Sequence, residues 1–389
     1  MATSIFRTSL CEQLGIEYPI VLAGMGSRGR ATPPALVAAV SEAGGLGVIG
    51  GSGLTPEELR DAIRETRSLT SKPVGVDLIL PGKVAAEAGG TRSAVRAQLR
   101  QRFPEHVAFV ERLMEKFELS PVEVDNEFVV ANTSGADGGT PGQTNRNNIQ
   151  QQVDVIMEED VQVFAAGLGD PSWVVPLAHD RDMKVMGLAG SPRNAERQKA
   201  AGVDIIVAQG YEAGGHTGKI ANFPLIPQVI DAVAPMPVLG AGGISDGRGI
   251  AAALALGASG AWIGTAFLVA AECAIDPQNK QQIVDGRSQD FDIRRIYTGK
   301  TMRSYKNSAV QAWDESGLEP LPMPYQKIMM DDFNASAAAA GRYDLHSNPA
   351  GQASGMLASV RPAAEIFDDL VTGTIQALEQ TQSAVEFSA

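Results

Sequence analysis

Short apolar segments rich in β-branched residues alternate along the chain with amphipathic, alanine-rich segments. Several of the apolar segments are apolar on both faces, which is typical of parallel strands covered by helices. The predicted strands are residues 18–24, 45–50, 73–80, 161–167, 183–190, 203–210, 235–243 and 258–265. The predicted helices between them are residues 33–43, 55–68, 191–201 and 246–256.

Eight strands alternating with helices over about 250 residues predict a (β/α)8 TIM barrel. A doubly wound open sheet is the alternative, because alternation alone does not establish that the sheet closes. The helices at 55–68 and 191–201 open with Thr-Pro and Ser-Pro, which are helix-start signals. We predict a barrel over residues 1–271 with an insertion at 82–146. Residues 272–389 are predicted to form a smaller, mostly helical domain that covers the barrel mouth and returns to the barrel.

The insertion follows the third predicted strand. It contains a predicted helix at 91–117 and a Gly-, Asn- and Thr-rich piece at 132–148. Because active sites of barrels lie at the carboxyl ends of the strands, this position predicts a lid over the site. Arg92, Arg96 and Arg100 recur at helical spacing, and we interpret them as a solvated helix face rather than a phosphate site.

Charge and cysteine content narrow the function classes. The 389 residues carry a formal net charge of −13, which argues against a general binder of nucleic acid or of anionic membranes. The two cysteines, Cys11 and Cys273, exclude a disulfide framework and a cysteine zinc site, so a reduced, cytoplasmic protein is expected. Residues 249–271 carry no charge, but the glycines among them favour helix, turn and strand over a membrane span.

Two glycine-rich turns close the last two predicted strands. The first is VLGAGGISDG at 238–247, and the second is WIGTAF at 262–267. Glycines let backbone N–H groups approach an anion, and a following helix N-terminus adds a favourable dipole. Barrels commonly hold a phosphate after strands seven and eight. The pair therefore predicts a phosphate site, which suggests FMN or a phosphorylated metabolite as the ligand.

A histidine lies in the loop after the sixth predicted strand, AQGYEAGGHTG at 208–218. Because a histidine can act as a general base near neutral pH, His216 is the candidate catalytic residue. The alternative is a histidine that only satisfies carbonyl groups of its loop. His106, His179 and His346 lie elsewhere, and the spacing of the histidines does not resemble a metal site, so no metal is expected.

The motifs PIVLAGMG, AGGLGVIG, AQGYEAGGHTG, GAGGISDGRGIAAALALGASG and GTAFL, in this order, resemble those of the nitronate monooxygenases. FMN-dependent enoyl-acyl-carrier-protein reductases and some NADH:quinone reductases share these features. The resemblance covers most of residues 14–275 outside the insertion. It implies a flavoprotein that binds FMN non-covalently and oxidises alkyl nitronates or nitroalkanes with O2 to carbonyl compounds and nitrite. It leaves a homodimer open.

Two other functions stay open beside this one. The first is an NAD(P)H-dependent flavin reductase of enoyl thioesters or quinones. Its pyrophosphate or carrier could bind the basic run at 294–306, although a structural role for that run is the simpler interpretation. The second is a non-catalytic flavin-binding protein.

The resemblance also implies roles for individual residues. His216 would be the base or a hydrogen-bond donor to the substrate. The third-strand position is usually an Asn in the family, whereas this chain has Asp77. A carboxylate loses the amide's donors and adds negative charge, which would disfavour an anionic flavin. The cofactor-binding residues implied are Gly24, Met25, Asp77, Gln209, Gly214, Gly215, Gly242, Gly243, Trp262, Ile263, Gly264, Thr265 and Gln352, the last beside Gly351.

Overall fold

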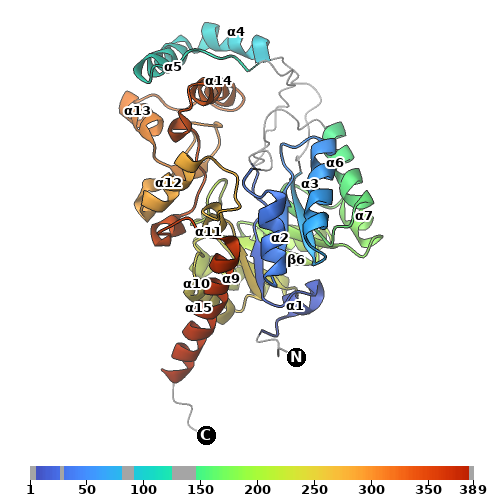
Figure 1. The fold of residues 1–389 in the computed structure, drawn as a ribbon. Helices are drawn as coiled ribbons and strands as arrows, with labels where there is room; N and C mark the ends of the chain where they lie inside the picture. The colour runs from blue at the N-terminus through green and yellow to red at the C-terminus, as the bar shows by residue number, and fades with distance from the viewer. Residues whose placement is uncertain (1–5, 27–29, 81–91, 125–145, 385–389) are drawn as a thin grey trace.

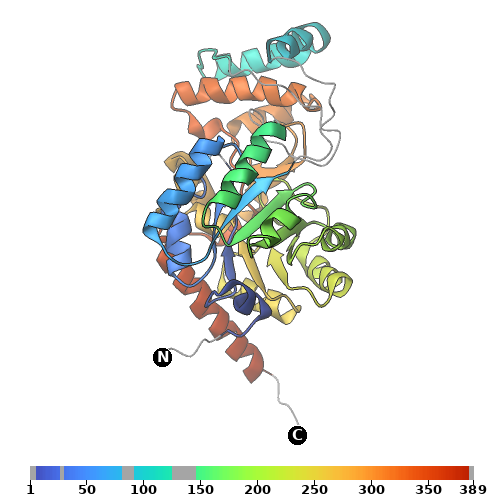
Figure 2. The same ribbon diagram turned by 90° about the vertical axis from the view of Figure 1, so that its right-hand side faces the viewer.

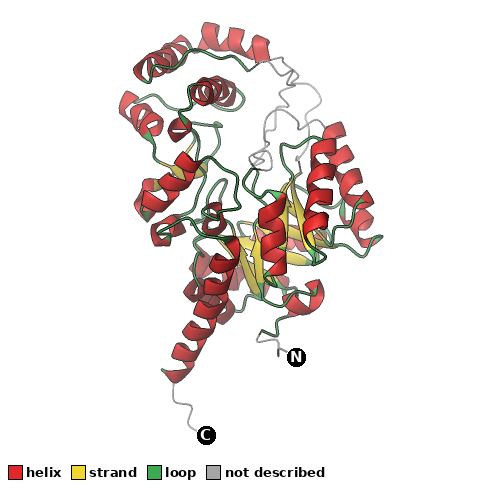
Figure 3. Ribbon diagram, viewed as in Figure 1, coloured by secondary structure: helices red, strands yellow, loops and turns green. Residues whose placement is uncertain are grey.

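A computed structural model of the protein describes residues 6–26, 30–80, 92–124 and 146–384. Eight parallel strands form one sheet in the order β1-β8-β7-β6-β5-β4-β3-β2 (Figures 1 and 3). Each predicted apolar segment contains one of them, except that the fourth strand ends one residue beyond its segment, so the strand predictions are confirmed. The strands are β1 Ile20–Leu22, β2 Gly47–Gly50, β3 Val74–Ile79, β4 Val163–Leu168, β5 Lys184–Ala189, β6 Ile205–Gln209, β7 Val238–Ala241 and β8 Gly260–Ile263.

The two ends of this sheet meet. A parallel bridge joins Val21 of β1 to Leu46, just before β2. The Leu22 N–H donates to the Leu46 carbonyl at 2.9 Å, and the Leu46 N–H donates to the Ile20 carbonyl at 3.0 Å. The strands therefore form a (β/α)8 TIM barrel, and the open-sheet alternative is wrong.

Apolar side chains fill the barrel interior toward its amino end. Helix α1 (Ser9–Leu14) lies across that end and packs Leu10 and Leu14 against inward-facing strand residues such as Val163 and Leu239. The Thr8 side chain caps the start of α1 by accepting from the Cys11 N–H. Because this end is packed shut, the carboxyl ends of the strands are left for a functional site.

Helices cover the outside of the barrel, and two of them start where the sequence predicts. Thr55 and Glu58 form a reciprocal capping box at the start of α3 (Pro56–Leu69), and Ser191 caps α8 (Pro192–Ala200). Among the described residues, no helix is long and apolar enough to cross a membrane. The other outer helices are α2 Pro34–Glu42, α6 Arg146–Glu158, α7 Val175–His179, α9 Asn222–Val233, α10 Gly247–Ala255 and α11 Thr265–Leu268.

A second hydrophobic cluster lies on the side of the barrel opposite α1 (Figure 2). Its large members include Phe109, Trp313 and Phe333, all buried. We call the four helices that build this cluster the cap. They are α4 Arg92–Arg102, α5 Pro104–Lys116, α13 Ser308–Ser316 and α14 Tyr325–Ala339. Two helices of the insertion thus share one core with two helices of the C-terminal segment.

Two further elements lie between the barrel and the cap helices α13 and α14 in the sequence. They are α12 (Pro277–Asp285) and the antiparallel hairpin of β9 (Phe291–Arg294) and β10 (Met302–Tyr305). The last helix, α15 (Ala363–Ser383), packs on the barrel helices α10 and α2. Helix α15 packs along α10, where a Cβ atom on Gly247 would lie 2.1 Å from the carbonyl carbon of Gly373. Only a glycine therefore allows the two backbones to lie this close.

The structure corrects two predictions for the insertion. The single helix expected at 91–117 is two helices, α4 and α5, which separate at Phe103 because Pro104 disfavours helical geometry in the residue before it. Arg92 and Arg96 are not solvated but buried, and they pair with Asp331 and Asp332 of α14 at 2.8 and 2.7 Å. The carboxylates that receive these arginines lie more than 230 residues further along the chain.

Most of the glycine-rich piece of the insertion, residues 132–145, lies outside the described residues. The lid function of the insertion stays a prediction.

The pair between Arg96 and Asp332 yields the first testable prediction. Asp332 accepts from the Arg96 guanidinium and also from the Val124 N–H at 3.0 Å. In Asp332→Ala the Arg96 guanidinium would lose its buried counter-charge and keep only the exposed Glu123 at 3.7 Å, so we expect the free energy of unfolding to fall by about 3–5 kcal/mol in urea titrations. Asp369→Ala is the control, because its pair with Arg361 is exposed and should contribute only about 0–1 kcal/mol. Equal losses of unfolding free energy in the two variants would contradict a stabilising role for the buried pair of Arg96 and Asp332.

Candidate active site

The glycine loops after β7 and β8 lie side by side at the carboxyl end of the barrel. Parallel pairing places Gln209 of β6 opposite Ala241 of β7, and Ala241 opposite Trp262 of β8. Gly242 and Gly243 follow β7 with φ angles of +93° and +70°. In this left-handed region a glycine is favoured over other residues. The two turns therefore expose backbone rather than side chains at the mouth.

The space around these glycines is closely fitted. A Cβ atom on Gly242 would lie 2.9 Å from the Ala213 nitrogen, and one on Gly243 would lie 3.1 Å from the Glu212 Cβ. A Cβ atom on Gly264, after β8, would lie 3.2 Å from the Met25 sulfur. A side chain at any of these three positions would press on neighbouring protein atoms, so glycine keeps the backbone uncovered there. We call the three glycines the cradle.

The loop after β6 is held in place from both of its ends. The Gln209 side chain donates to the His216 carbonyl at 2.8 Å, and the Thr217 hydroxyl donates to the Gly210 carbonyl at 2.8 Å. The backbones of Gly215 and Arg303 exchange two hydrogen bonds, of 3.0 and 2.8 Å. The β9–β10 hairpin thus fixes the loop that carries the predicted catalytic histidine.

His216 differs from the other histidines in its hydrogen bonding. Its Nε2 atom is buried and has no hydrogen-bond partner among the residues that the structure describes. The Nε2 atoms of His106 and His346 each lie within 2.9 Å of a backbone carbonyl, and that of His179 lies 3.0 Å from Asp204. Within the described residues, Nε2 of His216 therefore satisfies no carbonyl group of its loop, and the catalytic role of this histidine stays a prediction.

The pKa of His216 is lowered from its ordinary value to about 4. Burial is the main cause, because it disfavours the charged imidazolium, and the positive charges of Lys300 and Lys327 act in the same direction. The imidazole is therefore neutral at pH 7. Lys327 is itself ion-paired with Asp331 at 2.6 Å, which offsets its positive charge toward other groups.

Asp77 lies in β3 beside Gly24, at the same end of the barrel. A Cβ atom on Gly24 would lie 2.3 Å from the Asp77 Cβ. Burial raises the pKa of the Asp77 carboxyl to about 8, although a hydrogen bond from the Gly167 N–H opposes the shift. The expected negative charge is therefore absent from most molecules at pH 7. The sequence argument that Asp77 would repel an anionic flavin assumed an ordinary carboxylate, and the raised pKa of Asp77 does not support that assumption.

The C-terminal Gly-Gln element reaches the loop after β6. The Gln352 N–H donates to the Glu212 carbonyl at 3.0 Å, and the Gly351 N–H donates to the Thr265 hydroxyl at 2.9 Å. A Cβ atom on Gly214 would lie 2.6 Å from the Ala350 carbonyl carbon. The structure therefore brings together residues that are more than 80 positions apart in the sequence.

The side chains of Trp262 and Ile263, two neighbouring residues predicted to bind the cofactor, point to opposite sides of the barrel wall. Trp262 faces the barrel interior, whereas Ile263 packs into the outer layer between sheet and helices. The Ile263 side chain therefore points away from the site, so only its backbone could take part. Gly264 and Thr265 supply the accessible part of this segment.

Comparisons with known proteins agree with this geometry. A model of the family described as nitronate monooxygenase matches residues 7–373. The chain is 38% identical to a Mycobacterium tuberculosis protein named as a monooxygenase, with 98% of this chain and 100% of that protein covered. It is 29% identical to a Staphylococcus aureus protein named as a nitronate monooxygenase, with 96% and 99% covered.

Two solved structures of related proteins are similar to this chain over nearly its whole length. Nitroalkane oxidase from Streptomyces ansochromogenes superposes with a TM-score of 0.76 at 27% identity, over 96% of this chain and 99% of that one. FabK from Thermotoga maritima superposes with a TM-score of 0.73 at 28% identity, over 97% and 99%.

The chain belongs to the nitronate monooxygenase family. As a member of this family it is a flavin-dependent oxidoreductase, and the alternative of a non-catalytic binding protein is wrong.

Several residues of this family member's site were missed by the sequence analysis. Glu212 accepts from the Asn222 N–H at the start of α9, and the Asn222 side chain donates to the Gly242 carbonyl. Thr32 is buried and joins the Met25 carbonyl to the Gly50 N–H, through hydrogen bonds of 3.2 and 2.8 Å. No local motif marks Thr32 or Asn222, because their partners lie on other βα units.

Arg303 is the other missed residue, and it clarifies the basic run at 294–306. It is 1% exposed and donates to the Phe291 and Tyr211 carbonyls at 2.6 and 3.0 Å. Its guanidinium also lies 4.7 Å from the centre of the Tyr211 ring. Arg294 pairs with Asp292 and Asp314. These two arginines are structural, as the simpler interpretation of the run held.

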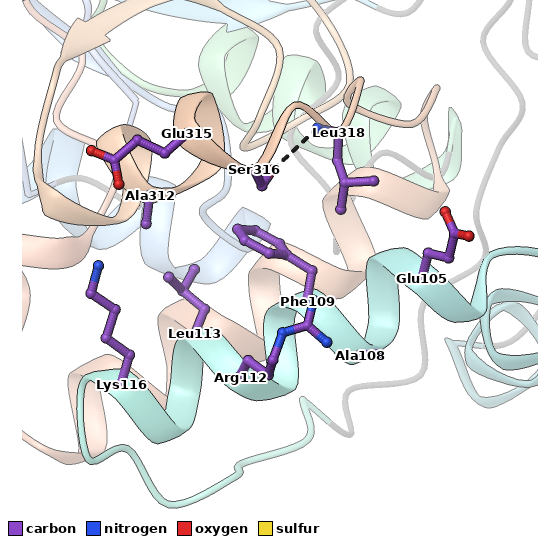
Figure 4. Close-up of a pocket in the computed structure, with 10 residues that line it drawn as sticks. All are labelled: Glu105, Ala108, Phe109, Arg112, Leu113, Lys116, Ala312, Glu315, Ser316 and Leu318. Atoms are coloured by element: carbon purple, nitrogen blue, oxygen red, sulfur yellow. Dashed lines mark hydrogen bonds between the residues drawn. The ribbon is translucent and has the colours of Figure 1, made fainter.

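A groove with a volume of about 610 Å³ lies between α5 and α13, in the cap (Figure 4). Phe109, Leu113 and Leu318 supply its apolar lining, and Glu105 and Arg112 lie along it. The groove contains none of the residues predicted for the flavin site. It is therefore distinct from the candidate active site at the barrel mouth.

Proposed function

We propose that this chain is an FMN-dependent nitronate monooxygenase, which oxidises alkyl nitronates and nitroalkanes with O2 to carbonyl compounds and nitrite. The buried, unpartnered Nε2 atom of His216 at the mouth of the barrel carries the proposal. The matches to proteins named as nitronate monooxygenase and nitroalkane oxidase support the substrate class.

The residues present at the mouth fit a bound FMN. The cradle of Gly242, Gly243 and Gly264 would receive the phosphate, because each of these positions keeps backbone free of side chains. Gly24, Met25, Asp77 and Gln209 would lie against the ring system, and the Gly351–Gln352 element would close the site from the cap side. FMN would supply the redox chemistry of the reaction. The protein's part is to bind, orient and exclude water.

His216 would bind the nitro or nitronate group through Nε2. With a pKa of about 4, its ring stays neutral at working pH and can accept a proton from a neutral nitroalkane or a hydrogen bond from a protonated group. Lys300 would favour the nitronate anion beside it, since its positive charge acts at the imidazole. An anion bound there would in turn raise the pKa of His216 and so assist proton transfer to the ring.

The cap would cover the substrate. Lys327 lies on α14, and α14 is fixed by the buried pairs that join it to α4. We propose that residues 272–389, together with α4 and α5, act as one substrate-covering unit over the barrel of residues 1–271. Water exclusion at the mouth would then strengthen the electrostatic effect of Lys300 on the substrate.

A two-step experiment tests the proposed function. In the first, anaerobic step, purified holoprotein is mixed with NADH or NADPH while flavin absorbance is recorded. In the second step, a preformed nitronate is added in the presence of oxygen. We expect no fast bleaching by either nucleotide, and oxygen uptake with nitrite release on addition of the nitronate. Fast bleaching by a nucleotide without oxygen uptake on the nitronate would instead establish the flavin reductase. A colourless protein that FMN cannot reconstitute would overturn both.

A further inference from the structure

Asp77 occupies a niche that the neighbouring strands build around its side chain. In the barrel register it lies opposite Gly50 of β2 and Ala165 of β4. A Cβ atom on Gly24 would lie 2.3 Å from the Asp77 Cβ, and one on Gly167 would lie 2.6 Å from the Asp77 Oδ1. Two glycines on the two sides of β3 thus make room for this one side chain at the flavin end of the barrel.

The described residues place no counter-charge in this niche. Asp77 is 6% exposed, and within the described parts of the chain it forms no ion pair. The groups that face it are Gly24 of the β1 loop, Val48 of β2, and Ala165 and Gly167 of β4, and none of these titrates. Among the described residues, the polar partner recorded for its carboxyl group is the Gly167 N–H, a neutral donor.

Burial without a counter-charge favours the uncharged form of a carboxyl group. The pKa of Asp77 is accordingly about 8, so about nine in ten molecules hold the proton at pH 7. A protonated carboxyl has an O–H donor as well as an acceptor oxygen, whereas a carboxylate only accepts. In its protonated form Asp77 therefore offers the same kinds of group as the asparagine amide that the family resemblance leads one to expect here.

We infer that Asp77 is a positioning residue that holds the flavin as a neutral carboxylic acid, its O–H donating to an acceptor atom of the ring system. This inference rests on the proposed function, because it requires a flavin at the barrel mouth. It reconciles the aspartate with flavin binding and makes cofactor affinity sensitive to alkaline pH. Loss of the proton would remove the donor and place a negative charge against the electron-rich ring edge.

The test is a set of FMN titrations of the apoprotein between pH 7 and pH 9, followed by flavin fluorescence. In wild-type protein we expect the Kd for FMN to rise about tenfold over this range, since the protonated fraction falls about tenfold around a pKa of about 8. In Asp77→Asn the Kd should stay level, because the amide keeps its donor at every pH. Asp231→Asn, an exposed substitution on α9, is the control and should follow wild type.

Thermal unfolding of the apoproteins provides a readout without flavin. An aspartate whose pKa is raised on folding costs stability progressively as pH rises from about 4 to about 8, and no further above that. The Tm advantage of Asp77→Asn over wild type should therefore grow between pH 5 and pH 8 and then level off.

Two negative results are distinguishable. Parallel pH dependence of the FMN affinity in wild type and Asp77→Asn would overturn the inference and leave the proposed function intact. Absence of FMN binding at every pH would overturn the proposed function itself.

Discussion

His216→Asn is expected to lower turnover of neutral nitroalkanes by about 10²–10⁴-fold, the usual contribution of a positioned general base. A neutral nitroalkane must lose a proton from carbon, and the Nε2 atom of His216 is the buried acceptor left without a partner at the barrel mouth. Turnover of a preformed nitronate should fall much less, because it needs no such step. Flavin content should stay near wild type, since the glycine cradle is untouched.

The matched control is His179→Asn. His179 is partly exposed and pairs with Asp204 on the outside of the barrel, so both substrates should be turned over at wild-type rates. Equal losses on nitroalkane and nitronate in His216→Asn, with flavin retained, would show that the histidine orients the substrate and is not a base. Loss of FMN in that variant would show that His216 mainly maintains the conformation of the loop after β6.

The pH profile gives a second readout for His216. Because burial and the two lysines lower its pKa to about 4, the ring loses its proton-accepting form only when pH falls toward 4. Turnover of a nitroalkane by wild type should therefore stay level as pH falls from 8 to about 5. An acid limb centred near pH 6.5 would indicate an ordinary, solvated histidine and contradict the environment described for it.

Local patterns were sufficient to predict most of the barrel. Each strand is a short apolar run, and α3 and α8 begin at the Thr-Pro and Ser-Pro signals because the caps are built from adjacent residues. Closure could not be predicted. It depends on the bridge between Val21 and Leu46, and such pairing follows from the collective twist of all eight strands rather than from either segment.

The environment of the candidate site was equally beyond local sequence. The motifs indicated which loops meet, and the resemblance placed Asp77 and His216 among them. The protonation of Asp77 depends on Gly24 and Gly167, which come from two other strands. The burial of Arg92 and Arg96 depends on an aspartate pair in α14. In each case the neighbouring residues come from distant parts of the sequence. The residue types alone therefore suggested a solvated carboxylate at position 77 and solvated arginines at 92 and 96, and both expectations were misleading.

Gly243→Asp is expected to abolish FMN binding. Gly243 has a φ angle of +70°, and a Cβ atom there would lie 3.1 Å from the Glu212 Cβ. An aspartate would add a carboxylate to the loop that we propose holds the flavin phosphate. Two unit charges about 4 Å apart repel by about 4 kcal/mol at an effective dielectric of about 20, which corresponds to roughly a thousandfold loss of affinity. The measurement is FMN content after purification, together with the Kd from flavin titration of the apoprotein.

Gly243→Asn separates charge from strain. Asparagine matches aspartate in size, and both tolerate the left-handed region better than other side chains, so the two variants share the backbone and packing costs and differ in the negative charge. We expect Gly243→Asn to bind FMN roughly a thousandfold more tightly than Gly243→Asp at low ionic strength. Salt screens the repulsion between the carboxylate and the phosphate. The difference in FMN affinity between Gly243→Asp and Gly243→Asn should therefore shrink as the ionic strength rises. Equal, salt-independent losses in both variants would mean that Gly243 is needed for the shape of the loop, and that the phosphate is bound elsewhere.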